Sequence, residues 1–275
     1  MTENNSLIKE LSEEQELKLE SNLVWVFASP RSGTKWLSNQ LLSYQTLAFN
    51  EPYIGYHLAS IGIFRENSKN SDFHRNRNTY FFSKYHEKTW KFFLRKLILN
   101  RIFSQFQNVS KKIIIKEPNG SQGADIIVKC LPLSKIIFLI RDGRDVVDSA
   151  LDARKENSWG TRLGITPVQT NTRIPLLREL ARKWQIRTNL LMNVFENHPS
   201  ELRYKLRYED LRKNTALELK KLYDFLDIRI TAEKIKELVE KFSFEKIPEG
   251  NKGSGKPTRF ATPGKWKENF SHEEK

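Results

Sequence analysis

The stretch from Leu23 to Trp36, LVWVFASPRSGTKW, limits the folds open to this chain more than any other. Residues 23–28 have strand character, and residues 29–34 contain the proline, glycine and small hydroxyl side chains of a tight turn. An amphipathic run then begins at Lys35. This order predicts a strand, a turn and a helix. Because the first N–H groups of such a helix have no intrahelical partner, the turn can hold an anion.

Four residues of this turn suit a phosphate site. Gly33 lets the backbone come close to a ligand, Ser32 and Thr34 provide hydroxyl donors, and Arg31 provides a permanent charge. The P-loop of nucleotide triphosphatases reads G-x-x-x-x-G-K-[ST], whereas here Gly33 is followed by Thr34 and only then by Lys35. The turn therefore predicts a phosphate cradle that departs from the nucleotide-triphosphatase pattern.

The composition also predicts an anionic partner. The 275 residues carry a formal net charge of +14, which suits a nucleic acid, an acidic membrane or a polyanionic cofactor. The chain has one cysteine, Cys130, so no intrachain disulfide can form. Neither the acidic residues 1–22 nor any later run resembles a secretory signal or a membrane span, and we expect a cytoplasmic protein.

A second anion site is predicted after residue 134. Residues 135–140, KIIFLI, form a continuous apolar run typical of a strand buried on both faces. Arg141 follows directly, and Asp142 or Asp145 can start a helix that carries Ser149. An arginine at a strand end and a serine on the following helix can converge on one phosphate, which the guanidinium binds through two parallel hydrogen bonds.

These two segments together resemble the sulfotransferases that use 3′-phosphoadenosine 5′-phosphosulfate (PAPS). The turn at 29–34 resembles their 5′-phosphosulfate loop, and Arg141 followed eight residues later by Ser149 resembles their 3′-phosphate site. Residues 208–210, Tyr-Glu-Asp, and the tail at 264–270 also resemble elements of the family. The resemblance implies an α/β, P-loop-like fold of three layers, in which helices flank a central parallel sheet of four or five strands.

The resemblance also divides the chain into segments. Residues 1–22 are interpreted as a charged leader and residues 23–275 as a single sulfotransferase domain. Residues 53–112 are expected to form a helical insertion on the acceptor side, and residues 248–275 an extended segment over the cofactor.

By resemblance, the cofactor is PAPS and its product adenosine 3′,5′-bisphosphate (PAP). Trp36 is expected to stack on the adenine, and Arg259 is the one residue retained from a family triplet that reaches over the 3′-phosphate. No metal is implied, since the five histidines are scattered. The residues implied to bind the cofactor are Arg31, Ser32, Gly33, Thr34, Lys35, Trp36, Arg141, Ser149, Tyr208 and Arg259.

The catalytic residues are expected at the ends of two further strands. Glu51 follows a short predicted strand, 18 residues after Gly33, about where several branches of the family carry a catalytic glutamate. Lys116 ends the run KKIIIK, which has strand character, and Glu117 follows it directly; by resemblance, the lysine matches one that could hold the sulfonate. Cytosolic members carry a histidine base two residues after that lysine, where this chain has Pro118. Glu51 and Glu117 are therefore both candidates for the base, and Arg31 is the candidate for stabilising the leaving group.

We therefore predict transfer of a sulfonate group to a hydroxyl or amine of a glycan, lipid or small molecule. A P-loop kinase is a near alternative, but it needs Gly-Lys-Ser/Thr and a magnesium-binding aspartate after a strand, where this chain has Arg141. A basic nucleic-acid-binding protein is the other alternative, although the resemblance implies no nucleic acid. Residues 73–106, with ten aromatic residues, eight cations and one acidic residue, either pack as helices or contact an anionic acceptor or membrane surface.

Overall fold

Five parallel strands form one central sheet in the computed structural model, which describes residues 10–42, 45–63 and 78–275. The strand order is β2-β3-β1-β4-β5, and every neighbouring pair is parallel. The predicted α/β fold with a central sheet of four or five strands is confirmed. The strands are β1 (Leu23–Ala28), β2 (Thr46–Asn50), β3 (Lys112–Lys116), β4 (Lys135–Ile140) and β5 (Arg203–Arg207).

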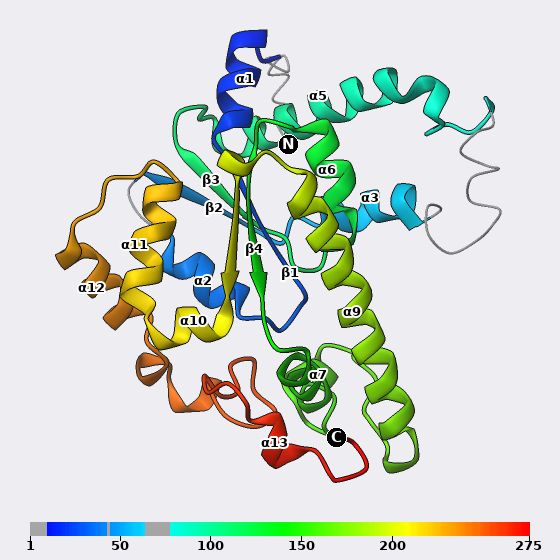
Figure 1. Cartoon of the computed structure of the whole chain (residues 1–275), viewed down its shortest axis with the longest axis vertical. Coiled ribbons are helices and arrows are strands. Elements are labelled where there is room, and N and C mark those ends of the chain that lie inside the picture. The colour runs from blue at the N-terminus through cyan, green and yellow to red at the C-terminus, as the bar shows by residue number, and fades with distance from the viewer. Residues whose placement is uncertain (1–9, 43–44, 64–77) are drawn as a thin grey trace, which may run out of the picture.

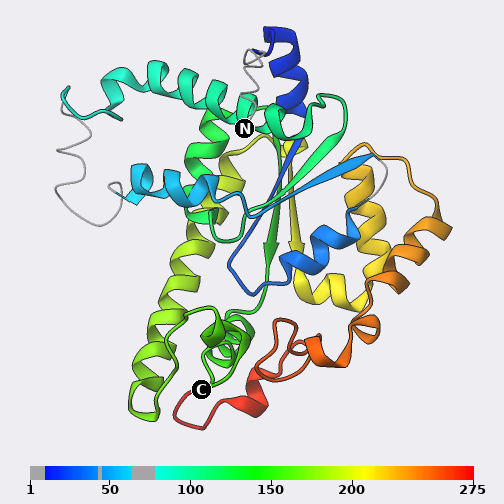
Figure 2. The same ribbon diagram turned by 180° about the vertical axis from the view of Figure 1, so that it is seen from behind.

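Helices cover both faces of the sheet and make three layers (Figure 1, and from behind in Figure 2). One face is covered by α1 (Glu13–Ser21), α5 (Glu87–Phe106), α6 (Ala124–Cys130) and α9 (Arg173–Asn197). The other is covered by α2 (Thr34–Gln40), α10 (Tyr208–Lys213), α11 (Thr215–Phe225) and α12 (Ala232–Lys241). The remaining helices are α3 (Ile54–Ile63), α7 (Gly143–Asp152), α8 (Trp159–Arg162) and α13 (Trp266–Asn269). Short 3₁₀ helices are η1 (Lys84–His86), η2 (Ser121–Gly123), η3 (Thr170–Thr172), η4 (Ser200–Leu202), η5 (Phe244–Lys246) and η6 (Glu249–Asn251).

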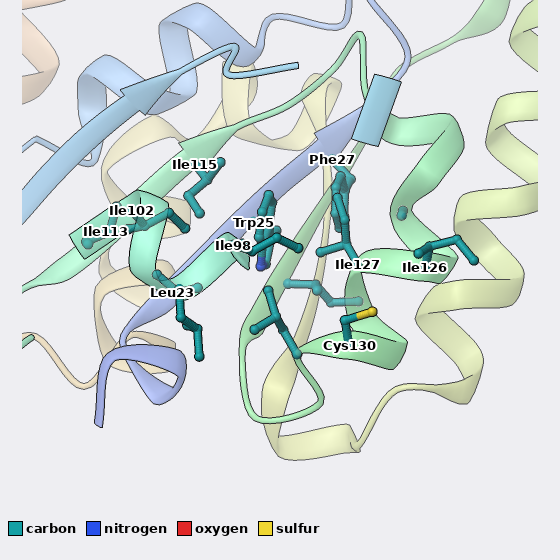
Figure 3. Close-up of a cluster of buried hydrophobic side chains, with 14 of the residues drawn as sticks. Leu23, Trp25, Phe27, Ile98, Ile102, Ile113, Ile115, Ile126, Ile127 and Cys130 are labelled. Carbon is teal, nitrogen blue, oxygen red and sulfur yellow. The ribbon is translucent and has the colours of Figure 1, made fainter. Parts of the chain in front are cut away.

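The core lies on both sides of β1, which is buried along its whole length. Alternate residues of a strand point to opposite faces, so Leu23, Trp25 and Phe27 enter one apolar cluster and Val24 and Val26 enter the other. Figure 3 shows the first cluster, in which isoleucines of β3 and α6 surround these side chains. A continuous apolar run is what a central parallel strand requires, and this explains why the LVWVFA segment could be placed from the sequence.

Helix α9 extends well past the carboxyl ends of the strands (Figure 1). Its C-terminal half packs on the sheet through Leu191 and Val194, whereas its N-terminal half packs on α7. The helix therefore borders the space at the carboxyl edge, where open parallel sheets bind their ligands.

The described part of the leader packs against the insertion. Arg95 of α5 donates to Glu20 at 2.8 Å and also pairs with Glu16, and both carboxylates are buried on α1. The first nine residues lie outside the described part of the chain. Buried ion pairs therefore hold helix α1 against helix α5.

The described part of the insertion at 53–112 consists of α3, η1, α5 and their connections. Residues 64–77, which include the start of the aromatic and basic segment 73–106, lie outside it. No helix among the described residues is long and apolar enough to cross a bilayer. Large apolar side chains of the segment that are more than half exposed are Phe81, Tyr85, Phe92, Phe93 and Leu97.

Candidate active site

The carboxyl edge of the sheet brings the two predicted anion sites together. The loop after β1 carries Arg31, and the loop after β4 carries Arg141. Because β1 and β4 are adjacent and parallel, both loops leave the sheet at the same edge. The loops after β2 and β3 follow along that edge and carry Glu51 and Glu117.

The loop after β1 has a backbone that few sequences can adopt. Gly33, at φ 92°, lies directly before α2, and a Cβ at this position would be 2.6 Å from Cε2 of Tyr208. Arg31 also adopts a left-handed conformation, with φ 74°, which is unusual for a residue other than glycine. Oγ of Ser32 is buried without a hydrogen-bond partner among the described residues. The loop thus has the close approach and the unsatisfied donor of an anion cradle.

Arg31 points from this loop toward α7 and the C-terminal segment. Its Nε donates to Oγ of Ser149 at 3.1 Å, and Nη2 donates to the carbonyl of Pro257 at 3.0 Å. The guanidinium also lies 5.0 Å from the centre of the Trp159 ring. Burial, together with the nearby charge of Arg141, lowers the pKa of Arg31 to about 10. The side chain stays protonated at neutral pH, but its charge is poorly compensated.

Arg141 reaches back to the same loop. Nη1 donates to the main-chain carbonyl of Arg31 at 3.1 Å, and the guanidinium stacks 4.3 Å from the centre of the Tyr208 ring. Its Nε is buried and has no hydrogen-bond acceptor within the part of the chain that the structure describes. Arg31, Arg141 and Ser149 therefore lie together at the carboxyl edge of the sheet, where open parallel sheets form their ligand crevice, and the two segments singled out in the sequence meet there.

Trp36 and Tyr208 form the aromatic side of this crevice. Their rings meet edge to face with centroids 6.1 Å apart, and Nε1 of Trp36 donates to the carbonyl of Phe242 at 2.9 Å. The hydroxyl of Tyr208 lies 3.4 Å from the carbonyl of Ala261, in the C-terminal segment. Arg141 stacks on the Tyr208 ring and Arg212 lies 5.2 Å from the centre of the Trp36 ring, so an adenine would meet ring surface and cations together here. Of the other two predicted cofactor residues in α2, Thr34 is buried, whereas Lys35 is exposed.

Arg259 is buried against α7. Its Nη1 donates to Asp148 at 2.7 Å, and its Nε lies 3.5 Å from Asp152. The charge of Arg259 still contributes to lowering the pKa of Arg31, so the two guanidinium groups are close neighbours. Arg259 is therefore held in the crevice by carboxylates that the sequence interpretation did not single out.

Acidic residues of α7 hold the C-terminal segment in place. Asp145 accepts from the backbone N–H of Gly264 at 2.7 Å, and Asp152 accepts from that of Gly255 at 2.8 Å. With Asp148, these residues recur at intervals of three and four, which places them on one face of α7. This acidic stripe, beside a tail rich in glycine and lysine, is the signal that could have identified the contact.

Glu51 is held by two short hydrogen bonds at the end of β2. Lys116 Nζ donates to Oε1 at 2.6 Å, and Asn119 Nδ2 donates to Oε2 at 2.6 Å. Glu51 and Tyr53 have positive φ values of 49° and 59°, and such strain in residues other than glycine is often found at functional sites. The carboxylate is partly exposed, which leaves it accessible to a substrate. Asn119 was not predicted, since nothing in the sequence pairs it with Glu51.

Glu117 lies beside Glu51 but is fully buried. Burial is the main cause that raises the pKa of its carboxyl to about 7, and the negative charge of Glu51 adds to the shift. A Cβ at Gly120 would lie 2.0 Å from Oε1 of Glu117, so the turn must have glycine there to accommodate the carboxyl. Near neutral pH, the Glu117 carboxyl, whose pKa is about 7, is therefore partly protonated.

A separate groove of about 1110 Å³ opens between α7, α9 and β5. It includes Arg141 and Gly143, but none of residues 29–36 lines it. Trp184 of α9 also lines it, and the indole would lie 2.7 Å from a Cβ at Gly143. The groove therefore adjoins the crevice at Arg141, although Arg31 does not line it. Among the described residues, no group of three or more His, Cys, Asp or Glu side chains could hold a metal ion.

Comparison with known proteins gives a consistent family and fold. The family model described as "Sulfotransferase family" matches residues 24–232. The mouse sulfotransferase SULT7A1 complexed with PAP is similar in fold, with a TM-score of 0.55 and 15% identity over 96% of this chain and 85% of that chain. The sulfotransferase domain from the Synechococcus PCC 7002 olefin synthase has a TM-score of 0.52 and 16% identity, over 91% and 88% of the two chains. Sulfotransferase STF9 from Mycobacterium avium has a TM-score of 0.51 and 13% identity, over 86% and 71%. No curated protein sequence matches the chain.

Proposed function

The chain belongs to the sulfotransferase family, and we propose that it transfers the sulfonate group of PAPS to a hydroxyl or amine of a glycan, lipid or small-molecule acceptor. The observation that carries the proposal is the convergence of Arg31, Arg141 and Ser149 in one crevice, although they come from segments about 110 residues apart. The mouse enzyme with PAP shares the fold and supports this choice of cofactor.

The residues of the crevice fit a nucleotide with two phosphates. Two buried polar atoms of these residues, Oγ of Ser32 and Nε of Arg141, lack hydrogen-bond partners among the described residues. Because an unpaired buried polar atom is costly, such a set indicates a ligand that supplies acceptors. In the proposal, Arg31, Ser32, Gly33 and Thr34 hold the 5′-phosphosulfate, and Arg141 with Ser149 holds the 3′-phosphate. Trp36 and Tyr208 flank the adenine.

The cofactor would supply an activated sulfonate together with a good leaving group. By analogy with phosphoryl transfer, the protein contributes positioning and stabilisation of developing charge. Arg31 is suited to the leaving group because its charge is buried and is not neutralised by a direct carboxylate contact within the described residues. Lys116 is suited to hold the sulfonate oxygens, since its ammonium lies at the same edge, on Glu51.

We assign the general base to Glu51. A base must be ionised and must reach the acceptor, and Glu51 is partly exposed and held by two donors. Glu117 meets neither condition well, because it is fully buried and its pKa is raised to about 7. In the proposal, Glu51 accepts the proton of the acceptor's hydroxyl or amine, and Glu117 sets the local field.

Ligand-induced thermal stabilisation tests the proposal. The full chain is heated with PAP, with ATP and magnesium, and with a DNA oligonucleotide. A large stabilisation by PAP alone is expected, because a ligand that binds only the folded state raises its melting temperature. Preferential stabilisation by ATP and magnesium would support a kinase instead, and preferential stabilisation by the oligonucleotide would support a nucleic-acid-binding protein. Transfer of labelled sulfonate from PAPS to acceptors in a cell extract then identifies the acceptor class.

A further inference from the structure

Arg187 occupies the middle of the inward face of α9. It lies one turn from Trp184, which packs on Gly143 at the start of α7, and one turn from Leu191, which is buried in the core. The residues of α9 that precede Arg187 pack on α7, and those that follow it pack on the sheet. Arg187 therefore lies close to the carboxyl ends of the strands, where the proposed crevice begins.

The surroundings of Arg187 provide no counter-charge. Neither a hydrogen bond nor an ion pair joins it to any residue in the described ranges, although its side chain is only partly exposed. Burial lowers the pKa of its guanidinium, and no neighbouring charge opposes that shift. Arginine in such a position is uncommon unless a partner is supplied, because desolvating a guanidinium without an acceptor costs free energy.

The position of Arg187 matches the acceptor side of the crevice better than the cofactor side. Helix α9 contacts η2, which directly follows the loop that contains Glu117 and Asn119. The charges that affect the pKa of Arg31 are those of Arg141, Asp152 and Arg259, and Arg187 is not among them. Arg187 thus lies apart from the cations that would hold the two phosphates, on a helix that contacts η2.

We propose that Arg187 binds a carboxylate on the acceptor, and that the enzyme therefore acts on anionic acceptors such as uronic acids. This inference rests on the proposed function. A planar guanidinium pairs with a carboxylate through two parallel hydrogen bonds, and a half-buried site strengthens that pairing. The exposed rings of Tyr53 and Tyr56, which meet edge to face with centroids 6.1 Å apart beside Glu51, offer an apolar surface for the remainder of such an acceptor.

A matched pair of probes tests the inference by binding alone. 4-Nitrophenyl β-D-glucuronide and 4-nitrophenyl β-D-glucoside differ only in a carboxylate against a hydroxymethyl group. Each is titrated calorimetrically into the full chain saturated with PAP, using wild type, Arg187→Gln and Arg182→Gln. Arg182 is the control because it is an exposed arginine of the same helix that lines the neighbouring groove between α7, α9 and β5.

We expect the wild type to bind the glucuronide at least about tenfold more tightly than the glucoside, as a charged hydrogen-bonded pair in a partly desolvated site requires. Arg187→Gln should reduce this preference to less than about twofold, while Arg182→Gln retains it. The inference is overturned if the wild type shows no preference, if neither probe binds, or if the preference survives in Arg187→Gln. Stabilisation by PAP is measured on all three proteins, and its absence in the wild type rejects the proposed function itself. Normal PAP stabilisation without a carboxylate preference rejects only the role of Arg187.

Discussion

Nε of Arg31 donates a hydrogen bond to Oγ of Ser149 at 3.1 Å, across 118 positions of sequence. The contact joins the loop after β1 to α7, which follows β4, so the two predicted phosphate sites are one site. It also means that the serine expected to bind the 3′-phosphate touches the arginine expected to act on the leaving group. A bound nucleotide would be contacted from both segments at once.

Replacing Arg31 should remove the main stabilisation of the leaving group. Arg31→Ala is expected to reduce kcat/KM for PAPS by about 10²–10³, the usual cost of losing one donor at a site of developing charge. Ser149→Ala should cost about tenfold or less, because it removes one neutral hydroxyl. Steady-state kinetics of both variants measure the effects, and equal losses would contradict the separate roles. Arg182→Ala, at an exposed arginine of α9 that lines the neighbouring groove and makes no contact with Arg31 or Ser149 among the described residues, serves as the control.

Glu51→Gln should abolish proton transfer while leaving the cofactor site intact. Turnover is expected to fall by about 10²–10⁴, within the range for losing a general base, while the thermal stabilisation by PAP stays unchanged. Glu117→Gln should retain most of the turnover, since the neutral amide resembles the protonated carboxyl. If Glu117→Gln abolished turnover and Glu51→Gln did not, the base would be Glu117.

The raised pKa of Glu117 predicts a specific pH dependence of stability. The carboxyl has a pKa of about 7 in the folded chain, against 4.5 for an ordinary glutamate. Between these values the folded state binds more protons than the unfolded state, so stability falls as the pH rises from about 4.5 to about 7. Above pH 7 the folded state has lost the whole of this contribution to its free energy of unfolding, which is up to about 3 kcal/mol.

Glu117→Gln removes this titration and should flatten that part of the stability profile. Urea denaturation at pH 4.5, 6 and 8 measures it, with the exposed Glu273→Gln as the control. A profile for Glu117→Gln with the same slope as the wild type would show that Glu117 is not the group responsible.

Much of the sheet, and the place of Arg31 and Arg141 at its carboxyl edge, could be predicted because both depend on local sequence. A buried parallel strand is a continuous apolar run, and the residue after it lies at the carboxyl edge, as Arg31 and Arg141 do. The partners of these residues could not be predicted in the same way. Asn119 meets Glu51, and Asp148 meets Arg259, across 68 and 111 positions, and no local pattern encodes such pairs.

The orientations of individual side chains could not be predicted from the sequence either. The sequence predicts that Trp36 stacks on the adenine. In the structure, Nε1 of Trp36 donates a hydrogen bond to the carbonyl of Phe242, the residue that follows α12, and this bond holds one edge of the indole ring in place. The role of Trp36 in adenine binding stays a prediction. Arg187 was not singled out either, because no motif marks it and only the folded structure shows that it is partly buried without a partner among the described residues.

A comparison of Gly33→Ala with Gly164→Ala separates the effect of a steric clash on stability from the effect of backbone strain. Gly33→Ala combines a positive φ with a methyl group 2.6 Å from the Tyr208 ring, whereas Gly164 has φ 87° and nothing within 4 Å of an added Cβ. Gly164→Ala should cost about 1 kcal/mol of stability from strain alone. Gly33→Ala should cost a further 1–3 kcal/mol, roughly the penalty for overpacking, and should weaken PAP binding. Equal losses of stability in the two variants would show that the contact with Tyr208 is unimportant.

The central claim is that Arg31 and Arg141 bind opposite ends of one doubly phosphorylated adenosine. Calorimetric titration of PAP and of adenosine 5′-phosphate into wild type and Arg141→Ala tests it most directly. The account predicts one PAP per chain, at least about 100-fold tighter binding of PAP than of adenosine 5′-phosphate, and loss of most of that difference in Arg141→Ala. Equal affinity of the wild type for the two nucleotides, or an equal loss of both in Arg141→Ala, would contradict the account.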